Sequence, residues 1–236
     1  MATTKYIRLG ASKSIGMEGT VSRSVEDYLV AVYRLQELYG IARTSEVAKV
    51  LGVKPATATK VLQRLAREGY IVWEPYRGFK LSSKGLSIAL RVVWRHRVAE
   101  RFLHDILGFD VVQSHVIAHQ LEHLPDEFFK RLYEYLGKPS KCPHGNPIPN
   151  PSELEMPRVN DVALALLSPS VECVVSRVLC FVDEKLIAEA MSMGIGVGSR
   201  IRVVEKGSDG MLVEVNGVKR FLSYALARII RCEPRR

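Results

Sequence analysis

The sequence predicts a mainly helical protein with a small amount of β structure, divided into three folded units. The first third of the chain shows the order helix, short helix, turn, helix, hairpin, which is typical of a winged helix-turn-helix. Three more helical patterns follow it. After a proline-rich segment, short strand signals separated by tight turns predict a C-terminal SH3-like β-barrel, small and partly open.

The net charge of the chain comes from its N-terminal part. The 236 residues include 34 Lys and Arg against 25 Asp and Glu, which gives a net charge of +9. Residues 1–100 hold 17 basic and 8 acidic residues and account for the whole excess. This basic excess falls on the segment that predicts a winged helix, and it indicates contact with a nucleic acid or another acidic surface at the N-terminal end. The expected nucleic acid is double-stranded DNA.

The composition excludes several other classes of protein. No apolar run reaches the roughly 18 residues that a membrane-spanning helix needs, so we expect no membrane association. The basic, polar N-terminus lacks the apolar stretch of a signal peptide. The four cysteines are irregularly spaced and form no C-x-x-C motif. This argues against a disulfide framework and for a reducing, cytoplasmic compartment.

Three helices and a hairpin make up the first unit. Ser24 is expected to cap the first helix, which ends at Gly40, and Thr44 is expected to cap the second. A proline opens the third helix, where it is well tolerated. The second and third helices are expected at 45–51 and 55–68, and the strands of the wing at 70–73 and 79–81.

The rest of the sequence predicts three helices, then a linker and a region of short strands. The helices are expected at 83–107, 111–124 and 126–136. Many prolines between 137 and 157 indicate an extended linker. The last part predicts strands at 171–181, 200–204, 211–215, 218–222 and 228–232, with a short helix at 183–193.

Five of the six histidines lie between residues 96 and 123. Metal-competent side chains lie on two adjacent predicted helices, His96 and Glu100 on the first and His115, His119, Glu122 and His123 on the second. The spacing i, i+4, i+7, i+8 puts the second set on one helical face. Imidazole nitrogen and carboxylate oxygen together suit divalent transition metals. His104 lies off this face and is expected to be structural.

Two other interpretations stay open. His119, Glu122 and His123 fit the H-x-x-E-H pattern of one zinc-peptidase group, in which two histidines bind zinc and the glutamate is the general base. The extra candidate ligands favour a saturated site over an open catalytic one, so we expect no enzyme, with a zinc hydrolase as one alternative. The other alternative is a winged-helix regulator that metal does not control.

Five strings carry a resemblance: SVEDYL at 24–29, YRG at 76–78, RHRVAER at 95–101, the segment 115–123, and GNPIP at 145–149. Together they resemble the diphtheria toxin repressor and manganese transport regulator family of metal-dependent transcriptional regulators. The likeness covers residues 22–150, and the C-terminal region matches the family's SH3-like domain by pattern. The resemblance implies a homodimer that binds a palindromic operator when a divalent metal has ordered it. It also implies that the bound dimer represses metal-uptake genes.

This resemblance divides the chain into five parts. They are an N-terminal extension at 1–22, a winged helix DNA-binding domain at 23–84, a helical metal-binding and dimerisation domain at 85–137, a Pro-rich linker at 138–170 and an SH3-like (FeoA-like) domain at 171–236.

The resemblance also implies two metal sites, a primary one formed by Asp27, His119, Glu122 and His123 and an ancillary one formed by His96, Glu100 and His115. Iron-sensing members have a Met and a Cys where this chain has Asp27 and His119, and losing both sulfur ligands favours harder metals. Val30 and His119 replace two carboxylates of the manganese branch. The expected cofactor is Mn²⁺ or Fe²⁺, with Zn²⁺ and Co²⁺ as alternatives.

The third helix is the expected recognition helix. Its N-terminal residues should face base edges: Lys54, Pro55, Ala56, Thr57 and Lys60. Phosphate contacts are expected from Arg43, Thr44, Ser45, Thr59, Arg64 and the wing residue Arg77. The expected dimer interface uses apolar residues of the last three helices, namely Phe102, Leu103, Leu107, Phe128, Phe129, Leu132 and Leu136.

Overall fold

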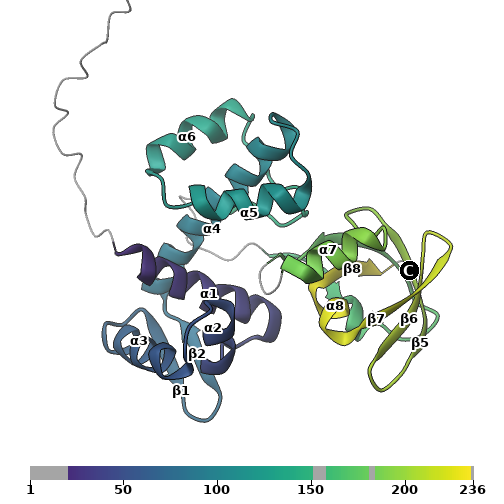
Figure 1. The fold of residues 1–236 in the computed structure, drawn as a ribbon, viewed down its shortest axis with the longest axis horizontal. Coiled ribbons are helices and arrows are strands. Elements are labelled where there is room, and N and C mark those ends of the chain that lie inside the picture. The colour runs from purple at the N-terminus through teal and green to yellow at the C-terminus, as the bar shows by residue number, and fades with distance from the viewer. Residues whose placement is uncertain (1–20, 151–157, 181–183, 235–236) are drawn as a thin grey trace, which may run out of the picture.

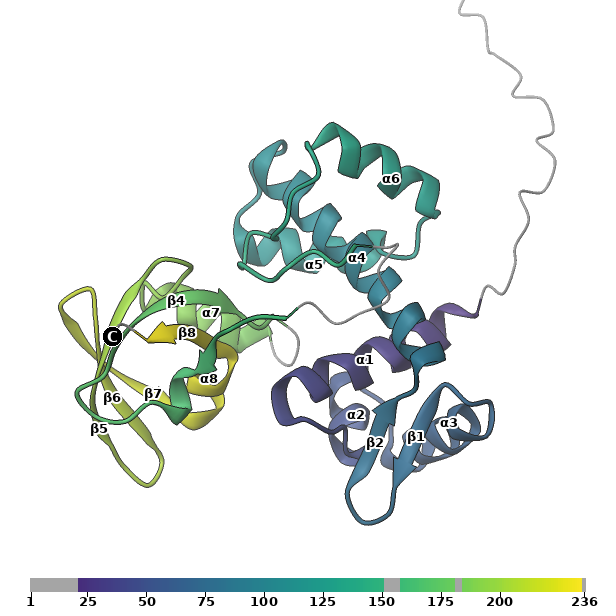
Figure 2. The same cartoon turned by 180° about the vertical axis from the view of Figure 1, so that it is seen from behind.

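The chain folds into three lobes (Figures 1 and 2). The computed structural model describes residues 21–150, 158–180 and 184–234. One lobe is the winged helix, the second is a set of three helices, and the third is built on a six-stranded sheet. Helix α4 begins directly after the wing and runs into the second lobe, so one continuous helix connects the first two lobes (Figure 1).

The winged helix has the predicted order of elements. Its helices are α1 (Arg23–Tyr39), α2 (Thr44–Val50) and α3 (Pro55–Arg67), and its strands are β1 (Ile71–Glu74) and β2 (Gly78–Leu81). Two expected caps were wrong. Ser22 caps α1 by accepting a hydrogen bond from the Val25 amide at 3.4 Å, because Ser24 already lies inside the helix. Thr44 also lies inside its helix, and Arg43 occupies the N-cap without a side-chain hydrogen bond.

The second lobe contains α4 (Ser83–Asp105), α5 (Val111–Leu121) and α6 (Asp126–Tyr135). Asp110 caps α5 in a capping box with Gln113, which fixes the start of the histidine-bearing helix. The core of this lobe is formed by large apolar residues, with Trp94 packed edge-on against Phe129 at 6.1 Å between ring centroids.

Part of the expected Pro-rich linker is folded. The backbone forms a β-bridge between Lys141 and Pro147, and the backbone amide of Cys142 donates to the Asn146 carbonyl at 2.9 Å. Ile148 is buried in the core of the second lobe. The expectation of an extended segment was therefore wrong for residues 141–148, because their polar and apolar side chains find partners in two lobes. Residues 151–157 lie outside the described part of the chain.

The third lobe is a six-stranded antiparallel sheet with the order β3-β8-β4-β5-β6-β7. Its elements are β3 (Val162–Ala163), the 3-10 turn η1 (Leu164–Leu166), β4 (Glu172–Val178), α7 (Glu184–Ser192), β5 (Arg200–Lys206), β6 (Gly210–Val215), β7 (Val218–Ser223), α8 (Tyr224–Ile229) and β8 (Ile230–Pro234). Within the described residues the end strands β3 and β7 do not pair, so the sheet has SH3-like size but is not closed.

Two expectations about this lobe need correction. The chain enters the sheet at β3, so residues 162–166 pack with the third lobe although the sequence placed them in the linker. The first residues of the expected strand at 228–232 belong to helix α8, and the strand begins at Ile230. Ser223 caps this short helix by accepting a hydrogen bond from the Leu226 amide at 3.2 Å.

A buried set of ion pairs joins the third lobe to helix α1. The Arg177 guanidinium on β4 donates to Asp161 at 2.6 Å and also contacts Glu37 of α1. Arg231 on β8 donates to the same aspartate at 2.9 Å. The side chain of Asp161 is fully buried.

None of the helices described is long and apolar enough to cross a bilayer.

Candidate functional site

The winged-helix lobe and the helical lobe meet at His123, two residues after the end of α5. Its Nδ1 lies 2.7 Å from a Glu26 carboxylate oxygen, and its Nε2 lies 3.2 Å from Asp27 Oδ1. Both carboxylates belong to the first turns of α1. Glu26 also faces Arg95 of α4 at 3.4 Å. One imidazole thus connects two lobes through residues far apart in the sequence.

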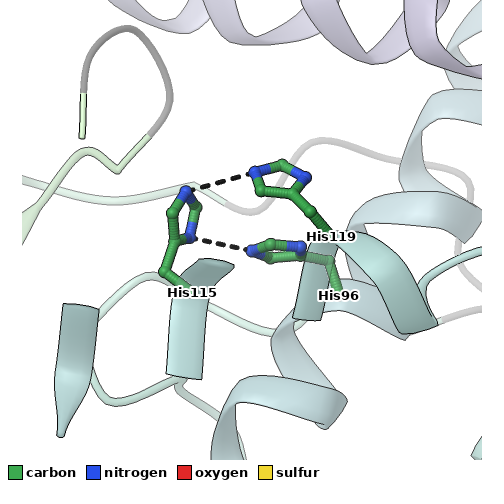
Figure 3. Close-up of side chains that lie close together, drawn as sticks. All are labelled: His96, His115 and His119. Carbon is green, nitrogen blue, oxygen red and sulfur yellow. Dashed lines mark hydrogen bonds between the residues drawn. The ribbon is translucent and has the colours of Figure 1, made fainter. Parts of the chain in front are cut away.

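Three imidazoles converge beside this contact (Figure 3). His96 Nε2 lies 3.0 Å from His115 Nδ1, and His115 Nε2 lies 3.2 Å from His119 Nε2. His96 comes from α4, and the other two come from successive turns of α5. His96 and His115 are buried, while His119 is half-buried. These ring nitrogens lie so close together that their lone pairs face one another. Burying them without a partner is unfavourable, whereas a shared cation would be coordinated by them.

Two carboxylates bridge these groups. Glu122 lies 2.7 Å from His96 Nδ1 and 3.2 Å from His119 Nδ1. Glu100 lies 2.7 Å from His115 Nδ1 and 3.1 Å from His96 Nε2. Both glutamates are buried. The structure therefore brings together all seven residues that the sequence proposed as metal ligands, with His96 in contact with both expected sites.

The protonation states of these groups suit cation binding. Burial, with the charge of His96 added, lowers the pKa of His115 to about 3 and that of His119 to about 4. Their rings are therefore neutral at pH 7 and have lone pairs to donate. Burial alone would raise the pKa of Glu100 and Glu122, but their histidine neighbours outweigh it and hold both pKa values well below the usual range. Both glutamates are therefore ionised.

The contacts of His123 predict that the stability of the metal-free protein depends on pH. Hydrogen bonds to Asp27 and Glu26 raise the pKa of His123 to about 9. Since this value lies above the roughly 6.5 of an unfolded histidine, its contribution to stability is fully present below about pH 6.5 and is lost as the pH rises through about 9. A metal that bound His123 would displace this proton. We therefore predict proton release on Mn²⁺ binding at pH 7, measured by calorimetry in two buffers of different ionisation enthalpy. Asp27→Asn should reduce it, and zero release would contradict the assignment.

Sequence reasoning missed a second group of donors around Glu100. Cys142, His144 and Glu100 each offer a ligand atom within 4.8 Å of the others, and Cys180, directly after β4, forms a similar group with Glu100 and His115. His144 Nδ1 lies 3.3 Å from the Glu100 carboxylate, yet neither buried ring nitrogen makes a hydrogen bond among the described residues. Burial and the charge of Glu100 raise the pKa of both thiols. Unsatisfied imidazole nitrogens beside a carboxylate and thiols also fit a metal.

Two weak sequence signals existed for three of the missed residues. Glu26 precedes Asp27, and the Cys-x-His pair at 142 and 144 stands out in the Pro-rich segment. Neither signal has helical periodicity, so spacing alone could not place them. His104 behaves as expected, with its Nδ1 2.9 Å from the Phe109 carbonyl oxygen.

The expected DNA-binding residues lie on one lobe and are accessible. All of them are exposed except Thr44 and Thr59, which are half-buried. Lys54 is the N-cap of α3 and Pro55 its first residue, so the basic N-terminal end of the helix faces solvent. The Thr59 hydroxyl donates to the Pro55 carbonyl at 2.9 Å and so can only accept from a partner.

The expected dimer interface is only partly exposed. Leu103 and Phe129 are buried in the core of their own lobe, so they cannot also form an exposed interface in this conformation. Leu107 and Phe128 expose 53% and 44% of their surface. Phe102, Leu132 and Leu136 are half-buried. An apolar surface thus remains on the helical lobe for contact with a second copy.

Three family profiles match successive parts of the chain. The first, described as the N-terminal DNA binding domain of iron dependent repressors, matches residues 20–79. The metal binding and dimerisation domain of the same repressors matches residues 82–150. A FeoA domain matches residues 162–234. The three matches follow the three lobes.

Individual relatives agree with these matches. The diphtheria toxin repressor of Corynebacterium efficiens is 29% identical over 220 residues, which cover 89% of this chain and 95% of that protein. The transcriptional regulator MntR of Bacillus subtilis is 41% identical over 100 residues, which cover 42% of this chain and 70% of that protein. The chain belongs to the diphtheria toxin repressor and manganese transport regulator family. Members of this family are transcriptional regulators, not enzymes, which disfavours the zinc hydrolase alternative.

The family binds DNA operators and dimerises through its metal-binding domain. A solved manganese-dependent transcriptional repressor in complex with manganese matches 89% of this chain and 99% of its own, with a TM-score of 0.74 and 28% identity. Solved relatives named ScaR hold Cd²⁺ or Zn²⁺. The chain matches both the DNA-binding and the metal-binding domain of this family, so membership favours metal control over the alternative of a regulator that does not sense metal.

Proposed function

We propose that this chain is a cytoplasmic, metal-activated repressor that binds a palindromic operator as a homodimer and controls metal-uptake genes. The contact of His123 with Asp27 and Glu26 carries the proposal, because it joins the DNA-binding lobe to the helical lobe at the candidate metal centre. A metal that moved these side chains would therefore change the orientation of the winged helix relative to the helical lobe.

We assign the primary metal site to Asp27, His119, Glu122 and His123, and the ancillary site to His96, Glu100 and His115. Support for the first comes from the grouping of Asp27, Glu122 and His123 within 4.8 Å, with Glu122 reaching His119. Support for the second comes from the contacts of Glu100 with both other members. The nitrogen and oxygen donors of the primary site favour Mn²⁺ or Fe²⁺, with Zn²⁺ and Co²⁺ as alternatives.

A bound divalent metal would supply the positive charge that lets these carboxylates and imidazoles share one centre. Asp27 would then hold the first turn of α1 against the end of α5. Because α1 packs on α4 and on the wing, this hold would fix the recognition helix relative to the dimer surface. Two recognition helices about 34 Å apart would fit successive major grooves of a palindromic operator.

The test is operator binding against metal at fixed salt, since salt alone changes DNA affinity strongly. The operator is selected by the Mn²⁺-loaded protein from a random pool of DNA duplexes. Its affinity is then titrated with Mn²⁺, Fe²⁺, Co²⁺ and Zn²⁺. We expect binding to require metal in the wild type and to be lost in Asp27→Ala. Enrichment of no duplex, or binding that is independent of metal, would overturn the proposal.

Two substitutions should separate sequence readout from phosphate contact. Lys60 is exposed on the recognition helix and can donate to guanine acceptors, so Lys60→Ala should change the preferred sequence. Arg77 on the wing is 72% exposed and is paired only with Glu74, at 3.2 Å, among the ion pairs described. Arg77→Ala should weaken binding to all sequences and reduce the salt slope by about 1. Equal losses on every sequence for both variants would show that this division of roles is wrong.

A further inference from the structure

One arginine is buried on the inner face of α1. Arg34 exposes only 7% of its surface. Asp27 and Val30 lie two turns and one turn before it, and Leu38 lies one turn after it, so these side chains share one face of the helix. Asp27 contacts His123 at the start of this face, and Leu38 packs against the core of the third lobe at its end. Arg34 therefore lies between two interfaces and not at the surface.

The charges that act on Arg34 belong to the candidate metal centre. Burial lowers the pKa of its guanidinium, and the carboxylates of Glu122 and then Glu100 act most strongly against this effect. Burial and the charge of His96 lower the pKa of His119, and the positive charge of Arg34 adds to them. Figure 3 shows the ribbon of α1 above the three imidazoles, and α1 packs on α4. A guanidinium from α1 and the candidate ligands of α4 and α5 thus share one buried region.

A buried arginine differs from a buried histidine in what it does when a metal binds nearby. Glu100 and Glu122 are buried and ionised, and ionised carboxylates away from water require a compensating charge. An imidazole supplies that charge when it is protonated, and it can then lose the proton and become a ligand. A guanidinium stays protonated and has no lone pair to donate. Arg34 therefore compensates the glutamates in the metal-free protein and remains a cation beside a bound metal.

Building on the proposed function, we propose that Arg34 is a fixed positive charge of the metal centre that sets the concentration of divalent metal at which the regulator responds. In the metal-free protein its attraction to Glu100 and Glu122 holds α1 against α4 and α5. A bound divalent ion is repelled by the guanidinium, and this repulsion is strong because the protein interior has a low dielectric constant. Arg34 acts through the ligands and binds no metal itself, so it is a positioning residue.

This role predicts the opposite change in metal affinity from a purely structural one. Replacing a residue that only supported the ligands would weaken metal binding, because the ligands would lose their arrangement. Replacing a residue that repels the metal strengthens binding instead, since the carboxylates keep their charge and the competing cation is gone. The direction of the change in Mn²⁺ affinity therefore separates the two roles.

The test measures Mn²⁺ binding to the full-length wild type and to Arg34→Met by calorimetry, at one pH and one salt concentration. Methionine is a long, flexible side chain without a charge. We expect Arg34→Met to bind Mn²⁺ at least about tenfold more tightly, because the buried like charge that opposes the divalent ion is removed. Operator binding should then begin at a correspondingly lower Mn²⁺ concentration. Arg34→Lys retains the positive charge and should bind Mn²⁺ like the wild type. Unchanged or weaker Mn²⁺ binding in a folded Arg34→Met would overturn the inference.

The stability of the metal-free protein gives a second readout. Metal-free Arg34→Met should unfold at a lower temperature than the metal-free wild type, and Mn²⁺ should raise its unfolding temperature by more. If the metal-free variant does not fold, folding that Mn²⁺ restores supports the inference. A variant that stays unfolded in saturating Mn²⁺ overturns it.

Arg131→Met is the matched control, because it removes the same charge from the exposed surface of α6, where Arg131 is 80% exposed and pairs with Glu127 at 3.0 Å. Water and salt screen a charge at such a position, so this variant should bind Mn²⁺ like the wild type. An equal gain in affinity in Arg131→Met would show a general effect of net charge and overturn the inference. If the wild type binds no Mn²⁺, the proposed function and this inference fail together. If the wild type binds Mn²⁺ and the operator while Arg34→Met binds Mn²⁺ no more tightly, only this inference fails.

Discussion

Replacing Glu122 with alanine is expected to abolish metal-dependent operator binding. This buried carboxylate contacts His96 at 2.7 Å and His119 at 3.2 Å, and it shares a cluster with Asp27 and His123. Through His96 it connects the primary site to the ancillary site. Loss of even an outer partner of a metal ligand lowers affinity by roughly 10–100-fold, so loss of this carboxylate should cost at least about a hundredfold in Mn²⁺ affinity.

The expected measurement is Mn²⁺ affinity by calorimetry, together with operator binding at the same Mn²⁺ concentration. Glu122→Ala also removes the partner of buried imidazoles, which can destabilise the metal-free fold by about 3–5 kcal/mol. Glu122→Gln keeps the size of the side chain and removes only the charge, so it tests the site if the alanine variant does not fold. Glu127→Ala is the control, because Glu127 pairs with Arg131 on the exposed surface of α6. Metal affinity in Glu122→Gln equal to that of the wild type would contradict the assignment.

The histidine face was predictable because it depends on helical period alone. His115, His119 and Glu122 follow the 3.6-residue repeat, and helix α5 keeps them on the side that faces His96. The contact of Glu26 with His123 was not predictable in this way, since 97 residues separate the two and neither periodicity nor composition reports that α1 packs there. The same holds for Cys180, which reaches Glu100 only because the third lobe packs against the helical lobe, with α7 on α5.

The elements that the sequence missed share a physical cause. Helix α8 spans six residues, and so short an apolar run fits a strand as well as a helix until the packing decides. The segment 141–148 has too many prolines for regular structure, yet Asn146 donates to the Val178 carbonyl at 2.8 Å and Ile148 enters an apolar core. Tertiary contacts, which local patterns do not contain, fold this segment. These contacts also bring Cys142 and His144 to the helical lobe, next to Glu100.

The buried Asp161 is expected to be the most sensitive position for the stability of the third lobe. It accepts hydrogen bonds from Arg177 and Arg231, and Arg177 also reaches Glu37 of α1. Asp161→Ala leaves two cationic side chains without this shared partner. Removing one member of a buried ion pair costs roughly 3–5 kcal/mol, because the remaining charge loses its compensation. The variant should therefore unfold at a lower urea concentration than the wild type, as measured by circular dichroism.

A matched control lies in the same sheet. Glu172 pairs with Arg202 at 2.8 Å, but both side chains are about half exposed, so Glu172→Ala should cost less than about 1 kcal/mol. The pH dependence adds a second readout. Burial alone would raise the pKa of Asp161, but hydrogen bonds from Arg177 and Arg231 outweigh it and lower that pKa. Its contribution to stability is therefore present above about pH 4 and is lost as the pH falls through the lowered value. Asp161→Asn should remove this acid sensitivity, and equal losses for the Asp161 and Glu172 variants would show that the buried network does not stabilise the lobe.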